Sequence, residues 1–239
     1  EDELRTIGEL ATRYDAIVIE DLAYLCMDFR KPLGRPFEAP YQATVARYTD
    51  NYILMISGSK IFSYAGQRIA MVCMSPAVAN REFPALTDFY HMPTFLKAYI
   101  FGVLYAASSG TSHSAQCALA AMLDAAADGK LDFVGDSREY GRRGERTKKI
   151  FTDNGFEIVY AKDGKEPIGD GFFFTAGYPG MDSETVQREL LRHGVSAISL
   201  PGTGSRQHGI RVCVSMISDD KAFDDLDRRL KAFNAEHHK

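Results

Sequence analysis

The sequence predicts an α/β domain with a mainly parallel sheet and helices on both faces, followed by a smaller α+β domain. Three short apolar runs without polar alternation, 16–19, 52–56 and 69–73, lie in the first third of the 239 residues. Such runs are typical of parallel strands that are buried on both faces. In the last third of the chain, strand-like runs alternate with helical patterns, which is typical of a mixed unit. We therefore expect two domains, over 1–130 and 131–239.

Helical spacing and composition predict the helices of the first domain. Apolar residues recur on one face of a helix over residues 2–14. Residues 92–107 and 112–128 are rich in alanine, leucine and aromatic side chains. Gly129 is suited to end the second of these two helices, because glycine readily adopts the conformation that closes a helix.

A basic segment over 132–153 carries six arginine and lysine side chains, interleaved with Asp136, Glu139 and Glu145. This mixed pattern is typical of the solvated face of a long helix. The whole chain has 28 basic and 32 acidic side chains and a net charge of −4, whereas nucleic-acid-binding proteins usually have a basic excess. We therefore expect no nucleic-acid partner.

The second domain is predicted to hold four strands and two further helices. A helix capped by Asp182 or Ser183 runs to His193 and ends at Gly194. Three successive phenylalanines, 172–174, are expected to belong to the core of the sheet. The predicted strands are 156–160, 172–176, 195–200 and 210–215, and a last amphipathic helix carries Phe223, Leu226, Leu230 and Phe233.

The composition excludes several classes of protein. With 45% hydrophobic and 25% charged residues, the chain is neither disordered nor a disulfide-dense miniprotein, and its longest apolar stretch, 98–107, is too short to span a bilayer. The four cysteines have no metal-ligand or redox-motif spacing. Cys73, Cys117 and Cys213 have apolar neighbours, so we expect buried thiols. We expect no metal site and a reducing, cytoplasmic location.

Polar side chains gather where the predicted strands end. Asp21 and Tyr24 follow the first strand, Ser57 and Lys60 follow the second, and Arg68 comes just before the third. Ligands of open α/β sheets collect at the carboxyl ends of the strands. The set combines a lysine that forms a Schiff base once deprotonated, a hydroxyl and a guanidinium for an anionic group, a carboxylate for a protonated ring nitrogen, and a phenol for a ring oxygen. These groups fit pyridoxal 5'-phosphate.

Two stretches carry a family resemblance. Asp-Leu-Ala-Tyr at 21–24 and Ser-Gly-Ser-Lys-Ile-Phe-Ser-Tyr-Ala-Gly-Gln-Arg-Ile-Ala at 57–70 closely resemble motifs of the fold-type I aminotransferases, class I and II. Gly58 stands where that family usually has a larger side chain, and Tyr64 stands where it usually has an aliphatic one. Neither departure removes a functional group, so we interpret both as subfamily variation.

The resemblance implies a role for each polar residue of these stretches. Lys60 is the catalytic lysine that forms the Schiff base with pyridoxal phosphate. Ser57 and Arg68 bind the phosphate of the cofactor. Asp21 pairs with the ring nitrogen, and Tyr24 with the ring oxygen.

A late stretch, Gly-Ile-Arg-Val-Cys-Val-Ser at 209–215, resembles the strand whose arginine binds the substrate α-carboxylate in that family. The role requires a planar fork of donors for bidentate pairing, which lysine does not supply. An arginine in an apolar strand is otherwise typical of an edge strand or an interface. With the lysine motif upstream, we expect Arg211 to bind substrate.

The resemblance implies a homodimeric aminotransferase that acts on an amino acid and a 2-oxo acid. It covers only the later part of the family's length, so we expect the earlier family motifs to lie upstream of Glu1. Two alternatives stay open. Lyases and decarboxylases of the same fold use the same lysine motif, and aminotransferase-like domains also bind effectors in bacterial transcription regulators.

Overall fold

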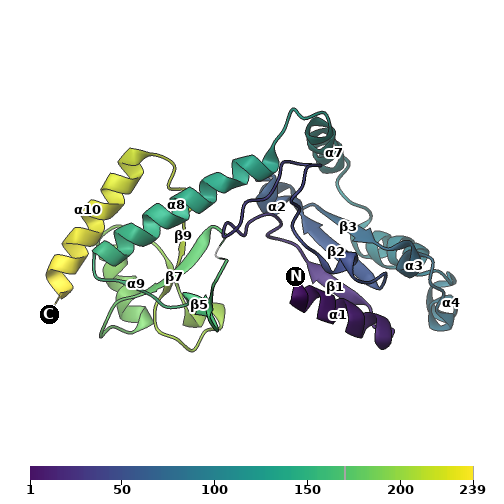
Figure 1. Cartoon of the computed structure of the whole chain (residues 1–239), viewed down its shortest axis with the longest axis horizontal. Helices are drawn as coiled ribbons and strands as arrows, with labels where there is room; N and C mark the ends of the chain where they lie inside the picture. Colours follow the sequence, from purple (N-terminus) through teal and green to yellow (C-terminus); the bar gives the residue numbers. More distant parts are fainter. Residues whose placement is uncertain (170, 239) are drawn as a thin grey trace. The chain divides into compact units, whose positions relative to one another are not determined.

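The computed structural model describes residues 1–169 and 171–238, which form two compact units. Unit 1 consists of Glu1–Cys26 and Leu33–Gly135, and unit 2 consists of Met27–Pro32 and Asp136–Lys239 (Figure 1). A short segment that follows the first strand therefore belongs to the second unit.

Unit 1 is built on a three-stranded sheet in the order β1 (Val18–Asp21), β2 (Tyr52–Ser57), β3 (Ala70–Met74). The first pair is parallel and the second is antiparallel. The predicted α/β class is confirmed, but the third run does not form a parallel strand. A parallel return needs a long crossover, usually a complete helix. The connection from β2 to β3 contains only the four-residue helix α2 (Gly58–Ile61) and the short turn η2 (Ala65–Gln67), so the chain folds straight back.

The strands of unit 1 are less buried than the apolar runs predict. Side chains of β1 alternate between half-buried and exposed, and Ile19 is 67% exposed. The helix predicted over 2–14 is confirmed as α1 (Asp2–Arg13), which packs on the turn η1 (Val45–Arg47).

The other helices of unit 1 follow β3. The segment predicted as one helix over 92–107 consists of α5 (Phe95–Lys97), the π-helical η3 (Ala98–Tyr105) and α6 (Ala106–Ser108). The next helix, α7 (His113–Ala127), ends as predicted near Gly129, whose φ is +71°. Two short helices precede them: α3 (Pro76–Ala79) and α4 (Pro84–Tyr90).

Unit 2 contains a four-stranded antiparallel sheet in the order β4-β7-β9-β8 and a small hairpin of β5 and β6. Its core holds the fully buried Phe151, Leu190, Leu230 and Phe233. The long helix α8 enters this unit at residue 136. The elements are α8 (Phe133–Asp153), β4 (Glu157–Ile158), β5 (Lys162–Asp163), β6 (Glu166–Pro167), β7 (Phe173–Gly177), α9 (Ser183–Arg192), β8 (Ile198–Ser199), η4 (Pro201–Thr203), β9 (Ile210–Cys213) and α10 (Asp220–His237).

Local sequence signals account for these elements. The Asp182 side chain accepts the backbone N–H of Thr185 at 2.8 Å and caps α9, and this hydrogen bond lowers the pKa of Asp182. Gly194 follows the helix with a φ of +74°. The basic segment is confirmed as a solvated helix face, because Arg142 and Arg143 both pair with Glu139.

The prediction of three buried thiols is wrong. Cys73, Cys117 and Cys213 are exposed, and Cys26 is the partly buried one. Burial raises the pKa of the Cys26 thiol to about 11. All four cysteines are free. In residues 1–169 and 171–238, no helix is both long and apolar enough to cross a membrane.

Candidate functional site

The carboxyl ends of β1 and β2 lie at the same edge of the sheet, because these strands are parallel. Asp21 ends β1 and Ser57 ends β2. The Asp21 carboxylate accepts the backbone N–H of Ala23 at 2.9 Å, which shapes the turn that leads to Tyr24. Two of the predicted residues are therefore placed by strand ends, and the third by a turn that Asp21 stabilises.

Ser57 also begins the helix that carries the lysine. Its hydroxyl accepts the backbone N–H of Ser59 at 3.1 Å, the capping interaction expected at the start of a helix. The backbone N–H of Gly58 donates to the carbonyl of Ile69 at 3.2 Å, which ties the start of α2 to the chain entering β3. A Cβ on Gly58 would lie 3.4 Å from that carbonyl, an ordinary contact, so sterics do not require glycine here.

Lys60, on α2, and Tyr24, in the turn after β1, lie close to each other. The Lys60 ammonium lies 5.6 Å from the centroid of the Tyr24 ring, within the range of a cation–π contact. Lys60 is half-buried and Tyr24 is 46% exposed. A lysine amine beside a phenol, on a sheet edge that also presents a carboxylate, can condense with an aldehyde and support an aromatic ring.

Arg68 lies between α2 and β3 in an unusual backbone conformation. Its φ of 53° and ψ of 50° are left-handed, which is uncommon for a residue other than glycine. Its guanidinium donates to the carbonyl of Ala65 at 2.7 Å, and the residue is exposed. An exposed guanidinium held to its own turn is suited to bind an anionic group. The donor set of unit 1 therefore fits pyridoxal phosphate: a hydroxyl and a guanidinium for the phosphate, an amine for the aldehyde, and a carboxylate and a phenol for the ring.

Arg211 belongs to unit 2, in an interior strand. It lies on β9 between β7 and β8, opposite Thr175 and Ile198, so it is not the edge-strand residue that its sequence context suggested. Its guanidinium lies 4.5 Å from the centroid of the Phe173 ring. Arginines such as Arg192 in the same unit pair with carboxylates, but within the described ranges no carboxylate pairs with Arg211. Its planar fork is therefore available to a carboxylate.

Phe173 lies at the margin of the core that residues 172–174 were predicted to form. Phe172 and Phe174 are buried in that core, whereas Phe173 is partly buried, packs against it and also lies beside the Arg211 guanidinium. Alternation along a strand accounts for the difference in burial between Phe173 and Phe174, because neighbouring side chains lie on opposite faces.

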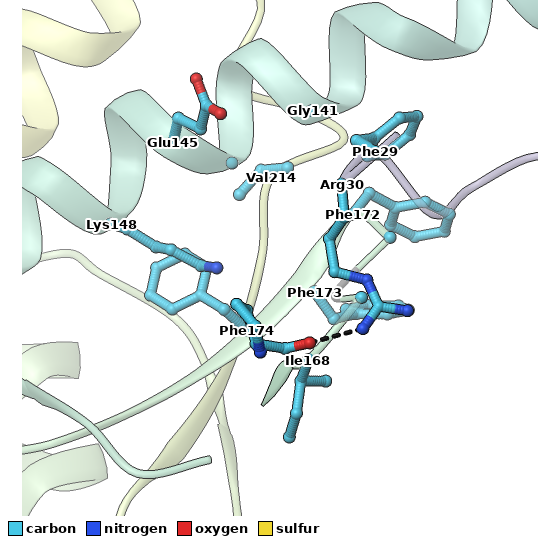
Figure 2. Close-up of a pocket in the computed structure, with 14 residues that line it drawn as sticks. Phe29, Arg30, Gly141, Glu145, Lys148, Ile168, Phe172, Phe173, Phe174 and Val214 are labelled. Carbon is cyan, nitrogen blue, oxygen red and sulfur yellow. Dashed lines mark hydrogen bonds between the residues drawn. The ribbon is translucent and has the colours of Figure 1, made fainter. Parts of the chain in front are cut away.

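Unit 2 also contains a small pocket of about 200 Å³ that holds none of the predicted site residues. Figure 2 shows its walls: Phe29 and Arg30 from the segment Met27–Pro32, Gly141 and Lys148 from α8, and the phenylalanines 172–174 at the start of β7. In the described part of the chain, no group of three or more His, Cys, Asp or Glu residues could hold a metal ion.

Comparison with known proteins identifies a family for this chain. The chain matches the family of class I and II aminotransferases over residues 1–224. No curated protein sequence matches it.

Solved structures share its fold at low sequence identity. An aspartate aminotransferase mutant from Thermus thermophilus is 19% identical with a TM-score of 0.67, over 98% of this chain and 55% of that one. A pyridoxal-phosphate-dependent aminotransferase from Streptococcus suis is 16% identical with a TM-score of 0.65, over 100% and 54%. A kynurenine aminotransferase from Pyrococcus horikoshii is 19% identical with a TM-score of 0.66, over 100% and 52%.

The chain thus spans about half the length of these structures. The family match covers nearly all of its residues: all of unit 1, most of unit 2 and every predicted site residue. The chain therefore belongs to the class I and II aminotransferase family.

Proposed function

We propose that the chain is part of a pyridoxal-phosphate-dependent aminotransferase that moves an amino group between an amino acid and a 2-oxo acid. The observation that carries the proposal is the position of Lys60, on a helix capped by Ser57 and within 5.6 Å of the Tyr24 ring. We assign residues 1–130 to the cofactor-binding domain and 131–239 to the smaller domain.

Each residue of the site then has a defined task. Pyridoxal phosphate supplies an aldehyde for the amine and a ring that withdraws electrons. Lys60 would hold the cofactor through its amine, and the same amine would take the proton from the substrate Cα as a general base. Asp21 and Tyr24 orient the ring through its nitrogen and its oxygen. Ser57 and Arg68 neutralise and hold the phosphate.

Arg211 serves the substrate in this proposal. The Phe173 ring lies 4.5 Å from its guanidinium and supports it, and the planar fork of donors can form two parallel hydrogen bonds to a carboxylate. Amino acids and 2-oxo acids share that carboxylate, which is why one arginine serves both halves of the reaction.

We also propose a homodimer located in the cytoplasm. The helical segment η3 exposes a run of large apolar side chains, as expected for a surface that another chain covers. These are Ile100, Phe101, Val103, Leu104 and Tyr105. The four free cysteines favour a reducing compartment.

The proposal is tested by locating the cofactor on the protein. The full-length protein is incubated with pyridoxal phosphate, reduced with borohydride and digested, and the mass of the phosphopyridoxyl group is located by mass spectrometry. We expect the label on Lys60, with loss of the visible cofactor band and of turnover in Lys60→Ala. Lys97→Ala, an exposed lysine of the same unit, is the matched control and keeps all three.

The products separate the proposed reaction from its alternatives. Incubation with an amino acid and 2-oxoglutarate yields glutamate in a transamination, whereas a lyase or decarboxylase releases ammonia or carbon dioxide without forming glutamate. An unlabelled Lys60, or unchanged turnover in Lys60→Ala, would contradict the proposal.

A further inference from the structure

A pocket of about 210 Å³, called the unit 1 pocket below, has all of its lining residues in unit 1. It contains none of the residues that we assign to the cofactor. Its walls are residues 25 and 26, the loop 33–42, and the facing parts of α7 and α8. Apolar side chains make up most of these walls, among them Leu25, Leu33, Leu123, Ala126, Phe133 and Val134. An apolar space of this kind offers few partners to water and is suited to an apolar occupant.

The loop 33–42 forms one wall of the pocket and is held in place by hydrogen bonds of the backbone. The backbone N–H of Gly34 donates to the carbonyl of Pro40 at 2.7 Å, which closes the loop on itself. The backbone N–H of Cys26 donates to the Gln42 side chain at 2.6 Å, which joins the end of the loop to the neighbouring wall. The wall is therefore formed without an occupant, and such preorganisation lowers the cost of binding.

Two residues of the pocket wall have left-handed backbone conformations. The φ of Phe37 is 65° and that of Cys26 is 60°. This region is uncommon for residues other than glycine and is least favourable for bulky ones such as phenylalanine. Phe37 is also 70% exposed. Strained residues gather at ligand sites, and Phe37 is the exposed ring that an occupant of the pocket would cover.

The charge at the unit 1 pocket is already paired within the same unit. Of the described residues that line the pocket, only Arg35 is charged. Its Nε lies 3.4 Å from the Asp132 carboxylate, which also accepts the backbone N–H of Gly135 at 2.8 Å. An anionic ligand would have to break this pair or place its charge against apolar walls, and both cost free energy. The lining therefore favours an uncharged ligand.

We propose that the unit 1 pocket binds an uncharged aromatic molecule. A cavity of about 150 Å³ lined by apolar side chains binds benzene. A pocket of about 210 Å³ has room for such a ring with a small substituent. Phe133 supplies an aromatic wall that is itself supported, because its ring packs edge-on against Phe62 with the centroids 4.9 Å apart. The proposal goes beyond the proposed function and does not depend on it.

Protection of Cys26 tests occupancy in the full-length protein, with toluene as the ligand. Cys26 lines the pocket, so toluene at about ten times its Kd should slow the labelling of this thiol by iodoacetamide roughly tenfold. Cys73 is exposed on β3 and does not line the pocket, so its rate should stay unchanged. An unchanged Cys26 rate, or an equal slowing of both thiols, would overturn the proposal. The measurement needs no variant, so it decides the matter even if a substitution prevents folding.

A pair of ligands of similar size tests the preference for an uncharged molecule. Toluene and benzoate both have a single ring, but benzoate carries a negative charge. We expect toluene to bind at least about tenfold more tightly, because the Arg35 guanidinium is paired with Asp132. Titration calorimetry of the full-length protein gives both Kd values. Equal affinities would show that the pocket accepts anions, which would overturn the proposed ligand class.

A matched pair of exposed phenylalanines tests the location of the site. Phe37→Ala removes an aromatic wall of the pocket and should weaken toluene binding about fivefold. Phe89 is 77% exposed in the same unit and does not line the pocket, so Phe89→Ala should leave the Kd unchanged. Equal effects of the two substitutions would overturn the proposal. None of these measurements uses pyridoxal phosphate, so their failure would leave the proposed function standing.

Discussion

Unit 2 has a continuous apolar core, whereas unit 1 has a small one and leaves much of its apolar surface open. Aromatic and aliphatic side chains from three helices (α8, α9 and α10) and two strands (β7 and β9) of unit 2 meet around Phe151 and Phe233. The corresponding cluster of unit 1 contains only Ile69, Ala115 and Leu119, with partly buried neighbours. The residues that we expect to hold the cofactor lie in unit 1, so stability and cofactor chemistry are concentrated in different parts of the chain.

The largest effect expected from this difference is on stability. Phe151 is fully buried among Phe156 and Phe174, so Phe151→Ala should lower the free energy of unfolding by about 3–5 kcal/mol. Phe89 of unit 1 is 77% exposed, so Phe89→Ala should change it by about 0.5 kcal/mol or less. Urea unfolding followed by far-ultraviolet circular dichroism measures both, since the chain has no tryptophan. Equal losses would show that unit 1 is as well packed around Phe89 as unit 2 is around Phe151.

The elements of the fold were predictable where local signals agree. Helix α9 follows from Asp182 and Gly194 at its two ends, and α1 from its spacing alone. The direction of β3 was not predictable in the same way, because an apolar run specifies burial and not strand polarity. The short connection through α2 decides it, and its length becomes clear only once the ends of both strands are known.

Two of the three wrong cysteine predictions, those for Cys213 and Cys117, have one cause. Apolar neighbours in sequence do not share a face with the residue between them. Cys213 lies between the buried Val212 and Val214 on a strand, so it points to the opposite side. Cys117 is two residues from both Ala115 and Leu119, which places it about 200° around the helix from each buried neighbour.

The next largest effect is expected in thiol labelling, which compares the reaction rates of an exposed and a partly buried cysteine of unit 1. Cys73 lies on β3 and is exposed, whereas Cys26 is partly buried with a thiol pKa of about 11. Only the thiolate reacts, so iodoacetamide at about pH 8 should label Cys73 roughly 100-fold faster than Cys26. The Cys26 rate should keep rising as the pH approaches 11. Mass spectrometry of the digested protein gives both rates, and a protected Cys73 would show that this sheet face is covered in solution.

The site was predictable to the extent that short motifs define it. Lys60, Ser57 and Arg68 lie in one stretch of sequence, and Asp21 and Tyr24 in another, so a resemblance could assign them. The Phe173 ring beside Arg211 and the packing of Met27 in the core of unit 2 depend on contacts between residues far apart in the sequence. No local motif reports such contacts.

The smallest expected effect concerns the ion pair between Asp28 and Arg30 in unit 2. Hydrogen bonding to Arg30 lowers the pKa of Asp28, so the folded state binds this proton less readily than the unfolded state does. The ion pair should therefore stabilise unit 2 above about pH 4 and lose that contribution as the pH falls through the lowered pKa of Asp28. Both side chains are nearly half exposed, so solvent screening keeps the effect well below that of Phe151→Ala.

Thermal unfolding of the wild type and Asp28→Asn across this pH range measures the contribution. The variant should have the lower Tm at neutral pH, and the difference should disappear in acid, where the wild-type carboxyl is also neutral. A Tm difference that persists unchanged in acid would show that Asp28 acts through packing against Gly169 and not through its charge. Residues 27–32 would then be held on unit 2 by packing, as Met27 is held by the core, and their contribution to Tm would not depend on pH.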